Sequence, residues 1–358
     1  MRKVIAKIDL ENIKSNAKTF VSLTGKPVCA VVKANAYGHG AEEVVNALSG
    51  IADCFAVSLL SEALSIRIVA CGKNVLIFSP PTFEEDIVVA AKNGFILTVG
   101  DFESAKRLVE ISQRHALLLR VHLKANTGMN RYGMGIKELE KTCLFLSTKT
   151  GVRVEGLYSH LYDYSLPVAL KQRATFIQMQ AVVSSYFSGI TCHLSATYGA
   201  LLGKEFAFDM TRIGIGLYGY LPDGAEDIPQ STLQNLALKK ALSVWAEVSA
   251  TGRYRAGGVG YGKAGASKGA PLTVLRYGYA DGFLRKKNNG VCGYENNANN
   301  LCMDACVRVG ESEKGTWLPV LTDAAETARI TGTISYEVLC AATRRAEMVY
   351  DNATFCGR

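Results

Sequence analysis

The sequence predicts an α/β fold in which a (β/α)8 TIM barrel is followed by a mostly β C-terminal domain. Eight apolar, strand-like runs alternate with helix-like segments up to Pro222. Beyond that residue the helical periodicity fades, while glycine and β-branched residues become more frequent. The chain of 358 residues also exceeds the usual size of one compact core, so we expect two domains.

The barrel is predicted from the number and order of the apolar runs. The strand-like runs are Val28–Val32, Cys54–Val57, Val75–Phe78, Phe95–Val99, Leu117–Leu123, Val152–Tyr158, Ile190–Leu194 and Met210–Leu217. Stretches with apolar residues three and four apart lie before or between most of them, and include Leu10–Leu23, Ala41–Leu48, Ile87–Lys92, Ser104–Ser112, Leu139–Ser147 and Ala169–Tyr186. Eight such repeats are typical of a parallel barrel, which carries its active-site groups at the carboxyl ends of the strands.

The domain boundaries follow from the same patterns. Residues 11–222 are predicted to form the barrel and residues 223–358 the mostly β domain. The strand-like runs of that domain are Ala241–Ala250, Pro271–Tyr277 and Asp304–Val309. The run Val4–Ile8 alternates like a strand and precedes the barrel, so residues 1–10 are predicted to join the β domain.

Composition excludes several classes of protein. Hydrophobic residues make up 48% and charged residues 20%, which is ordinary for a folded globular chain. The net charge of +8 comes from scattered lysines and arginines, which favours small anionic ligands over nucleic acid. Ten cysteines occur without a CxxC motif, so we expect reduced, mostly buried thiols and no metal site. Neither a secretory signal nor a membrane-spanning run is evident, so a cytoplasmic location is predicted.

Lys33 ends the first barrel strand and is followed by a Tyr-Gly-His-Gly turn. A lysine at this place either extends to solvent or holds its amine in a dry cleft. Burial there would lower its pKa, and the neutral amine could then condense with an aldehyde. His160, just beyond the sixth strand, and Arg212, in the eighth, can face the same mouth of the barrel.

The segment Val32-Lys-Ala-Asn-Ala-Tyr-Gly-His-Gly40 resembles the pyridoxal-phosphate attachment motif of alanine racemases. Further blocks resemble that family in its order and at its approximate spacing. They are His122-Leu-Lys-Ala-Asn-Thr-Gly-Met-Asn-Arg131, Gly156-Leu-Tyr-Ser-His160, Arg212-Ile-Gly-Ile-Gly-Leu-Tyr-Gly219, Val259-Gly-Tyr-Gly262, Tyr277-Gly-Tyr-Ala-Asp-Gly282 and Cys302-Met-Asp304. The whole chain is therefore similar to the fold-type III pyridoxal-phosphate enzymes of this family.

The resemblance implies a racemase in which two groups flank the α-carbon of an amino acid. Lys33 then holds pyridoxal 5'-phosphate as an imine and serves one face, while Tyr261 serves the other. His160 and Arg212 match a histidine and an arginine that connect to that tyrosine. Arg212 also matches the arginine that faces the pyridine nitrogen, and an always protonated guanidinium leaves that nitrogen uncharged, which favours racemisation over transamination.

The resemblance also implies how the phosphate is held, near the last two barrel strands. Gly214 and Ile215 match the family's backbone donors, and Tyr37 matches its hydroxyl donor. A second hydroxyl comes from the segment that begins at His193. Counting from His193 puts Thr197 at the family's serine position, and Ser195 is the alternative.

Other matches concern the substrate and a partner subunit. Arg131 is placed to hold either the phenolic oxygen of the cofactor or the substrate carboxylate. Lys124 matches a lysine that is carbamylated in some relatives and orients that arginine. Met303 aligns with a residue whose backbone amide contacts the substrate from the partner subunit, with Asp304 beside it. A head-to-tail homodimer with shared active sites is thus implied.

The carboxyl end departs from the family pattern. Thr343-Arg-Arg-Ala-Glu-Met348 replaces Ser-Tyr-Arg-Val-Pro-Arg, so Arg344 stands where alanine-specific members carry a tyrosine. The change either enlarges the pocket, as in the serine racemases linked to glycopeptide resistance, or lets Arg344 pair with the phosphate or with an acidic substrate. Those relatives carry an amino-terminal membrane domain, so this chain is expected to be free-standing or the excised soluble part of a longer protein.

The predicted function is racemisation of alanine, serine or both, supplying D-amino acids for peptidoglycan precursors. Two alternatives are a decarboxylase of the same fold and a non-catalytic protein that binds pyridoxal phosphate. The decarboxylase would carry a catalytic cysteine in a motif that Cys302-Met-Asp304 does not resemble. The binding protein would lack both the β domain and Tyr261.

Overall fold

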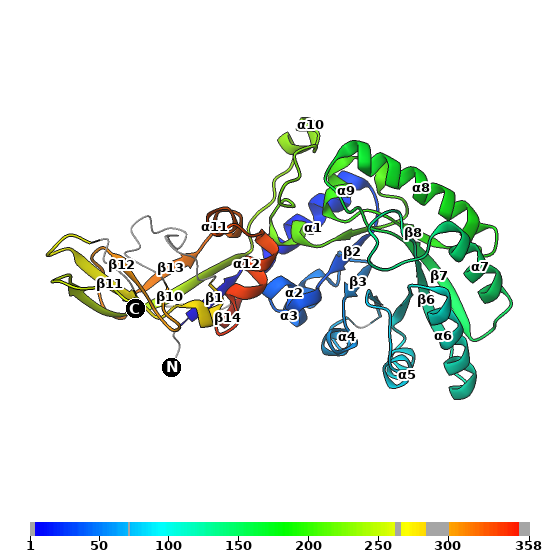
Figure 1. Cartoon of the computed structure of the whole chain (residues 1–358), viewed down its shortest axis with the longest axis horizontal. Helices are drawn as coiled ribbons and strands as arrows, with labels where there is room; N and C mark the ends of the chain where they lie inside the picture. The colour runs from blue at the N-terminus through cyan, green and yellow to red at the C-terminus, as the bar shows by residue number, and fades with distance from the viewer. Residues whose placement is uncertain (1–3, 71, 262–265, 284–300, 351–358) are drawn as a thin grey trace. The chain divides into compact units, whose positions relative to one another are not determined.

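The computed structural model describes residues 4–70, 72–261, 266–283 and 301–350 (Figure 1). The chain divides into two compact units, which are described separately here. One unit, which we call the barrel unit, consists of Ile13–Ala34 and Ala41–Leu238. The other, which we call the β unit, consists of Met1–Asn12, Asn35–Gly40 and Lys239–Arg358.

The barrel unit is built on eight parallel strands. They are β2 (Val28–Val31), β3 (Cys54–Val57), β4 (Asn74–Ile77), β5 (Ile96–Val99), β6 (Leu119–Lys124), β7 (Val152–Tyr158), β8 (Thr191–His193) and β9 (Thr211–Ile213). Their order in the sheet is β8-β7-β6-β5-β4-β3-β2-β9. Backbone hydrogen bonds from Asp209 to Cys192 (3.0 Å) and from Arg212 to Ser195 (2.9 Å) join the β8 and β9 segments and close the ring. The predicted barrel is confirmed.

Helices surround the strands on the outside of this sheet (Figure 1). They are α1 (Leu10–Thr24), α3 (Ala41–Leu48), α4 (Leu60–Ile66), α5 (Glu84–Lys92), α6 (Phe102–His115), α7 (Ile136–Ser147), α8 (Leu166–Ser184) and α9 (Thr197–Leu202), and the short α10 (Gln230–Gln234) follows. Each of the longer helices buries one face, as their three- and four-residue spacing predicts. Strands β2, β3 and β5 are buried at every position because helices cover one face and barrel side chains fill the other.

The β unit is built on a sheet with the order β12-β11-β10-β1-β14, and β13 also pairs with β10. The strands are β1 (Val4–Ile8), β10 (Leu242–Arg253), β11 (Pro271–Leu275), β12 (Cys306–Val309), β13 (Trp317–Leu321) and β14 (Glu347–Tyr350). Strand β1 runs antiparallel to β10 and parallel to β14. Helices α11 (Ala324–Thr331) and α12 (Ser335–Ala342) accompany this mostly β sheet.

Segment α2 (Lys33–Gly38) follows β2 and is left-handed. From Ala34 to Tyr37 the backbone φ angles are 52° to 54°, and Gly38 has a φ of 82°. Each non-glycine residue in this conformation costs about 1–2 kcal/mol, so specific contacts must hold the turn. In the barrel unit, Glu62 accepts a hydrogen bond from the amide of Ala34 (2.7 Å). In the β unit, Thr343 Oγ1 donates to the carbonyl of Gly38 (3.0 Å).

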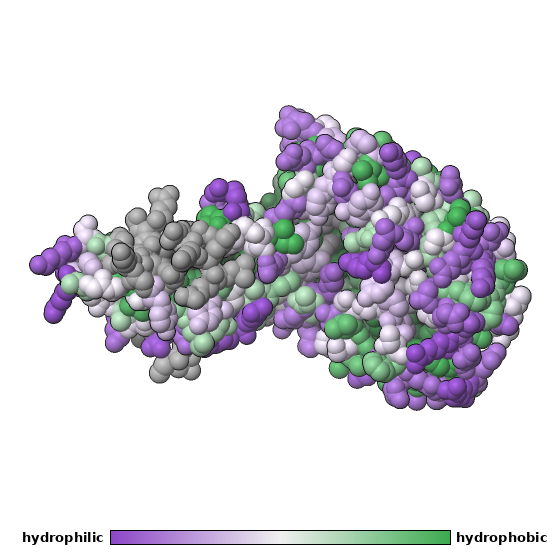
Figure 2. All heavy atoms as spheres, in the orientation of Figure 1, coloured by the Kyte–Doolittle hydropathy of each residue, from purple (hydrophilic) through white to green (hydrophobic). Residues whose placement is uncertain are grey.

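The surface in Figure 2 is mainly hydrophilic, with apolar residues scattered over the helices of the barrel unit. Leu144 of α7 and Leu170 of α8 are examples of exposed apolar side chains. Among the described residues, no helix has both the length and the apolar character that crossing a bilayer requires. The described cysteines are all free thiols.

Candidate active site

Positively charged side chains converge on His160, two residues beyond β7. The pKa of His160 is well below its usual value because of burial and because of the charges of Arg212, Lys124, Arg131 and Lys33, in that order. The structure thus brings together five of the predicted site residues within the barrel unit. Such a cluster suits an anionic ligand, and it keeps the imidazole of His160 neutral at neutral pH.

Arg212 is the most constrained of these residues, and only 2% of it is exposed. Its Nη1 donates to the carbonyl of His193 (2.8 Å) and to Nδ1 of the same residue (2.9 Å). Its Nη2 donates to the carbonyls of Ser159 (2.6 Å) and Leu194 (2.9 Å), and His160 Nδ1 lies 3.5 Å away. A guanidinium has five N–H groups, so these four bonds use every donor except Nε–H.

The positive charge of Arg212 is compensated in an unusual way. Within the described part of the chain, no carboxylate forms an ion pair with it, and carbonyl oxygens and an imidazole surround it instead. Burial lowers its pKa to about 10, although Tyr158 and Cys29 act in the opposite direction. Arg212 therefore remains protonated at neutral pH and can only donate hydrogen bonds.

Lys124 ends strand β6 and is also buried. Its Nζ lies 4.4 Å from the centre of the Tyr158 ring, and the hydroxyl of Tyr158 is 2.8 Å from Oγ1 of Thr98. The pKa of Lys124 is well below the usual lysine value because of burial and the charges of Arg212 and Arg131. Losing its proton therefore costs Lys124 less than it costs an exposed lysine, and its amine lies against an aromatic face.

The loop that carries Arg131 folds back on the end of β6. Met134 exchanges backbone hydrogen bonds with Lys124 and Asn126, each 2.9 Å long. The side chain of Asn126 accepts from the amides of Gly128 (3.0 Å) and Asn130 (3.2 Å) and donates to Oδ1 of Asn130 (2.9 Å). An aspartate could not make that last donation, so the asparagine suits this particular loop.

A second group of predicted residues lies after strands β8 and β9. Thr197 begins α9, and its Oγ1 accepts from the amide of Gly216 (3.2 Å). Gly214 and Ile215 are buried residues, and no carbonyl or side chain among the described residues accepts a hydrogen bond from their amides. Ser195 Oγ instead donates to the carbonyl of Phe206 (2.6 Å).

The remaining predicted residues belong to the β unit. Tyr37 is buried, and its ring centre lies 5.9 Å from that of Tyr336. Tyr261 and Met303 are 63% and 53% exposed, and Arg344 is also exposed. Gly262, the last residue of the Val-Gly-Tyr-Gly motif, lies outside the described residues.

The segment that carries Met303 and Asp304 is held by its neighbours in the β unit. The amides of Tyr279 and Ala280 donate to the carbonyls of Cys302 (3.1 Å) and Met303 (3.0 Å). Arg345 forms ion pairs with Asp304 (2.8 Å) and with Asp281 (3.4 Å). Sequence reasoning missed Arg345, although it follows Arg344 directly.

Sequence reasoning also missed the residues that support the barrel site. Tyr158 contacts Lys124 and stacks on His193, with ring centres 5.1 Å apart and planes at 7°. Glu62 holds the turn after Lys33. The sequence did contain a signal for one further residue of the barrel site. His122 and Lys124 are two apart on one strand, so alternation points their side chains to the same face.

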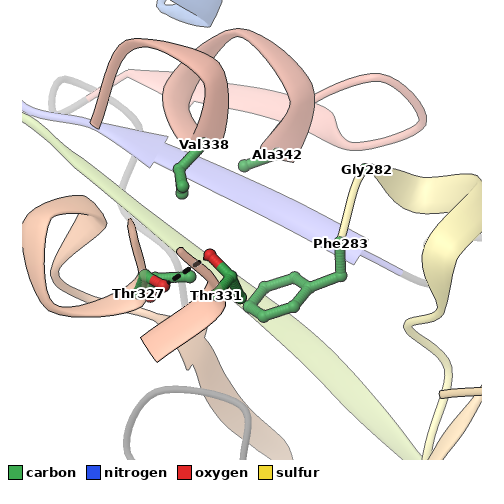
Figure 3. A pocket seen from close by; sticks show the side chains of 6 residues that line it. All are labelled: Gly282, Phe283, Thr327, Thr331, Val338 and Ala342. Carbon is green, nitrogen blue, oxygen red and sulfur yellow. Dashed lines mark hydrogen bonds between the residues drawn. The ribbon is translucent and has the colours of Figure 1, made fainter. Parts of the chain in front are cut away.

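One cavity in the β unit can be excluded as the site. Figure 3 shows its lining, and Thr331 donates a hydrogen bond to the carbonyl of Thr327 there. The lining residues are Gly282, Phe283, Thr327, Thr331, Val338 and Ala342. The centre of a water molecule can reach only about 10 Å³ of it, so it holds at most one water.

Comparison with known proteins identifies the family. Residues 8–222 match the model of the alanine racemase N-terminal domain, and residues 241–350 match that of the alanine racemase C-terminal domain. The chain belongs to the alanine racemase family. An alanine racemase from Francisella philomiragia is 31% identical over 287 residues, which cover 79% of this chain and 77% of that protein. The predicted racemase-like isomerase is confirmed at this level.

Solved alanine racemase structures agree with this assignment. The alanine racemase of Clostridium difficile 630 superimposes with a TM-score of 0.89 at 26% identity, covering 98% of this chain and 96% of that chain. The biosynthetic enzyme of Pseudomonas aeruginosa gives 0.84 at 29% identity, covering 98% and 99%. A Bartonella henselae alanine racemase, described with covalently bound pyridoxal phosphate, gives 0.84 at 25% identity, covering 98% and 100%. The alanine racemase family is pyridoxal-phosphate-dependent.

Proposed function

We propose that this protein is a pyridoxal-phosphate-dependent racemase that interconverts the L and D forms of alanine, of serine, or of both. The observation that carries the proposal is the state of Arg212. Its guanidinium is buried, fixed by four hydrogen bonds and left with a single N–H donor. That arrangement fits an arginine that donates to the ring nitrogen of the cofactor but supplies no proton to it.

The residues that would hold the other parts of the cofactor belong to the barrel unit, with the exception of Tyr37. Lys33 would hold the aldehyde carbon, and Thr197 with the amides of Gly214 and Ile215 would hold the phosphate, to which Tyr37 adds a hydroxyl. The two buried amides have no acceptor among the described residues, as expected of groups that bind an anion. Because Ser195 is engaged by Phe206, we favour Thr197 over Ser195. When bound, the cofactor would withdraw electrons from the α-carbon and so make its proton removable.

Two groups of the chain would then move the proton. Lys33 would take or return it on one face, and Tyr261 would do so on the other. His160 would connect Arg212 to that tyrosine, and its lowered pKa keeps it a neutral hydrogen-bonding group. Tyr261 and Met303 are exposed in the single chain, which supports a head-to-tail homodimer in which they serve the partner's site.

Arg131 would bind an anionic oxygen, either the phenolic oxygen of the cofactor or the substrate carboxylate. Lys124 would orient it after carbamylation. In that reaction the neutral amine adds to carbon dioxide, a C–N bond forms, and one proton leaves to solvent. The lowered pKa of Lys124 supplies the neutral amine that this addition needs. The product is an anion beside two arginines, which would stabilise it.

The substrate side chain is expected to meet residues of the β unit, where Met303 and Asp304 would contact the carboxylate end. Arg344 replaces a tyrosine that packs against the methyl group of alanine in the family, and its side chain is exposed in the single chain. We therefore include serine as a substrate. Either product would supply D-amino acids for cell-wall precursors.

Two measurements test the proposal together. Purified protein incubated with pyridoxal phosphate should show an absorbance band of a lysine-linked cofactor, and borohydride should fix the label to the peptide that contains Lys33. Chiral chromatography should then find D-alanine or D-serine formed from the L enantiomer. A labelled protein that forms neither product would be a binding protein, and the proposed activity would be wrong.

A further inference from the structure

Two buried histidines lie in series behind Arg212. His193 Nδ1 is 2.9 Å from Arg212 Nη1, and His193 Nε2 is 2.9 Å from Nδ1 of His122. His122 and His193 are 4% and 0% exposed. The three side chains come from β6, β8 and β9, and His122 has no role in the function proposed above.

Gly156 makes the contact between the two histidines possible. Strand β7 lies between β6 and β8, and its residue Gly156 is paired with His122. A Cβ atom at position 156 would lie 2.6 Å from both Cε1 and Nε2 of His122, a distance that real atoms essentially never show. The missing side chain therefore leaves the space through which His122 reaches His193 across β7.

The direction of the hydrogen bonds determines the tautomers. Arg212 has only donors, so Nδ1 of His193 must accept and the proton of His193 is on Nε2. That N–H donates to Nδ1 of His122, whose own proton is then on Nε2. Burial lowers the pKa of His122 to about 4 and that of His193 well below its usual value, so both rings are neutral at neutral pH.

Tyr158 fixes the plane of the His193 ring but not its tautomer. The two rings are stacked, and the hydroxyl of Tyr158 is held by Thr98 at 2.8 Å. Stacking contacts are the same whichever ring nitrogen carries the proton. The two groups that distinguish the tautomers are the donor at Arg212 and the acceptor at His122.

We propose that His122 is a positioning residue for Arg212. By accepting the Nε2 proton of His193, it keeps the Nδ1 lone pair of His193 available to Arg212 Nη1. The guanidinium then stays in the orientation that leaves Nε–H for the ring nitrogen of the cofactor. The link to the cofactor nitrogen rests on the proposed function, whereas the tautomer of His193 can be measured without any cofactor.

Two substitutions of His122 distinguish its role as a hydrogen-bond acceptor from its role in packing. His122→Leu keeps apolar bulk over Gly156 and removes the acceptor. His122→Asn keeps an acceptor, because Oδ1 of asparagine lies close to the place of the histidine Nδ1. Far-UV circular dichroism and thermal unfolding of both variants check that they fold.

The first readout needs no cofactor. Nitrogen-15 NMR of histidine-labelled, cofactor-free protein reports which ring nitrogen is protonated, and the chain has five histidines to assign by single substitution. Wild type and His122→Asn should show His193 protonated at Nε2 only. His122→Leu should show a shifted signal or a mixture of tautomers. An unchanged His193 spectrum in His122→Leu would overturn the proposal, whether or not the protein racemises alanine.

The second readout uses the cofactor-loaded enzyme. His122→Leu should lower kcat by about 10- to 100-fold with little change in KM, because a misplaced group near the reacting centre affects the transition state. His122→Asn should recover most of that loss. Equal losses in both variants would contradict the proposal. An inactive wild type with the expected His193 tautomer would refute the proposed function and leave the His122 contact supported.

Gly156→Ala provides an independent test. Its Cβ should displace the His122 ring and so give the same NMR change and a similar loss of kcat as His122→Leu. Both substitutions break the same contact, the one between His122 and His193. The double variant, Gly156→Ala with His122→Leu, should therefore lose no more kcat than the worse single variant. Additive losses would show that the two residues act separately and would overturn the proposal.

Discussion

The predicted site residues of the barrel unit and those of the β unit are held in different ways. Arg212 in the barrel unit is buried and makes four hydrogen bonds within the chain. Tyr261 and Met303 in the β unit expose more than half of their surface. Strand ends can surround a side chain within one barrel, whereas a side chain that is more than half exposed keeps surface that a second molecule can contact. This difference is what a site completed by a second subunit would require.

Replacement of Lys33 in the barrel unit should cause the greatest loss of activity. Lys33→Ala should lower racemisation by at least about 10³-fold, because it removes both the attachment point and one acid/base group. Borohydride should then fix no cofactor to the protein, as peptide mass spectrometry would show. Lys18→Ala, on the exposed face of α1, is the matched control and should behave as wild type.

Replacement of Tyr261 in the β unit should cause the second-largest loss of activity. Tyr261→Phe should lower kcat by about 10²- to 10⁴-fold, because the hydroxyl that exchanges the proton is lost. Half-buried Tyr254 is a suitable control, since its hydroxyl donates to the carbonyl of Gly257, and Tyr254→Phe should retain activity.

Mixing the two inactive variants tests whether Lys33 and Tyr261 of one site come from different chains. After unfolding and refolding Lys33→Ala and Tyr261→Phe together, about a quarter of wild-type activity should return. Half of randomly paired dimers are mixed, and each mixed dimer would have one of its two sites intact. No recovery from a mixture that refolds as dimers would mean that each site takes both residues from the same chain.

A smaller effect concerns acid stability, which should involve both units. Burial lowers the pKa of His122 in the barrel unit and of His39 in the β unit to about 4 each. The unfolded chain binds these protons near pH 6.5, so stability is full above that pH and falls as the pH drops from about 6.5 to 4. Each histidine should contribute up to about 3 kcal/mol. Urea unfolding of wild type and His122→Asn should show a weaker pH dependence in the variant.

The smallest effect concerns the left-handed turn. Thr343→Val keeps the shape of the side chain but removes the hydrogen bond to the carbonyl of Gly38. The free energy of unfolding should fall by about 1 kcal/mol, as measured by urea unfolding. Thr175→Val, at a half-buried position of α8, is a control with a local bond to Lys171, and a loss at position 343 no larger than at position 175 would mean that the turn does not depend on this contact.

The sequence predicted those features that depend on local periodicity. The eight barrel strands were identifiable because each lies in a short apolar run, although β9 covers only Thr211–Ile213 of the predicted run Met210–Leu217. The left-handed turn was not predicted, since alanine and asparagine have no preference strong enough to impose it, and contacts from Glu62 and Thr343 hold it. The choice between Ser195 and Thr197 was open because both lie in one segment. We propose Thr197, because the hydroxyl of Ser195 is engaged by the carbonyl of Phe206.

The alternation of strands and helices and the residue types at the strand ends could be identified from the sequence alone, because they depend on neighbours along the chain. Which buried polar groups contact each other became known only from the three-dimensional fold. His122 and His193 are 71 residues apart and touch because β7 carries a glycine between their strands. Such a contact depends on the order of strands and on empty space beside a third residue, and no local pattern encodes either of these.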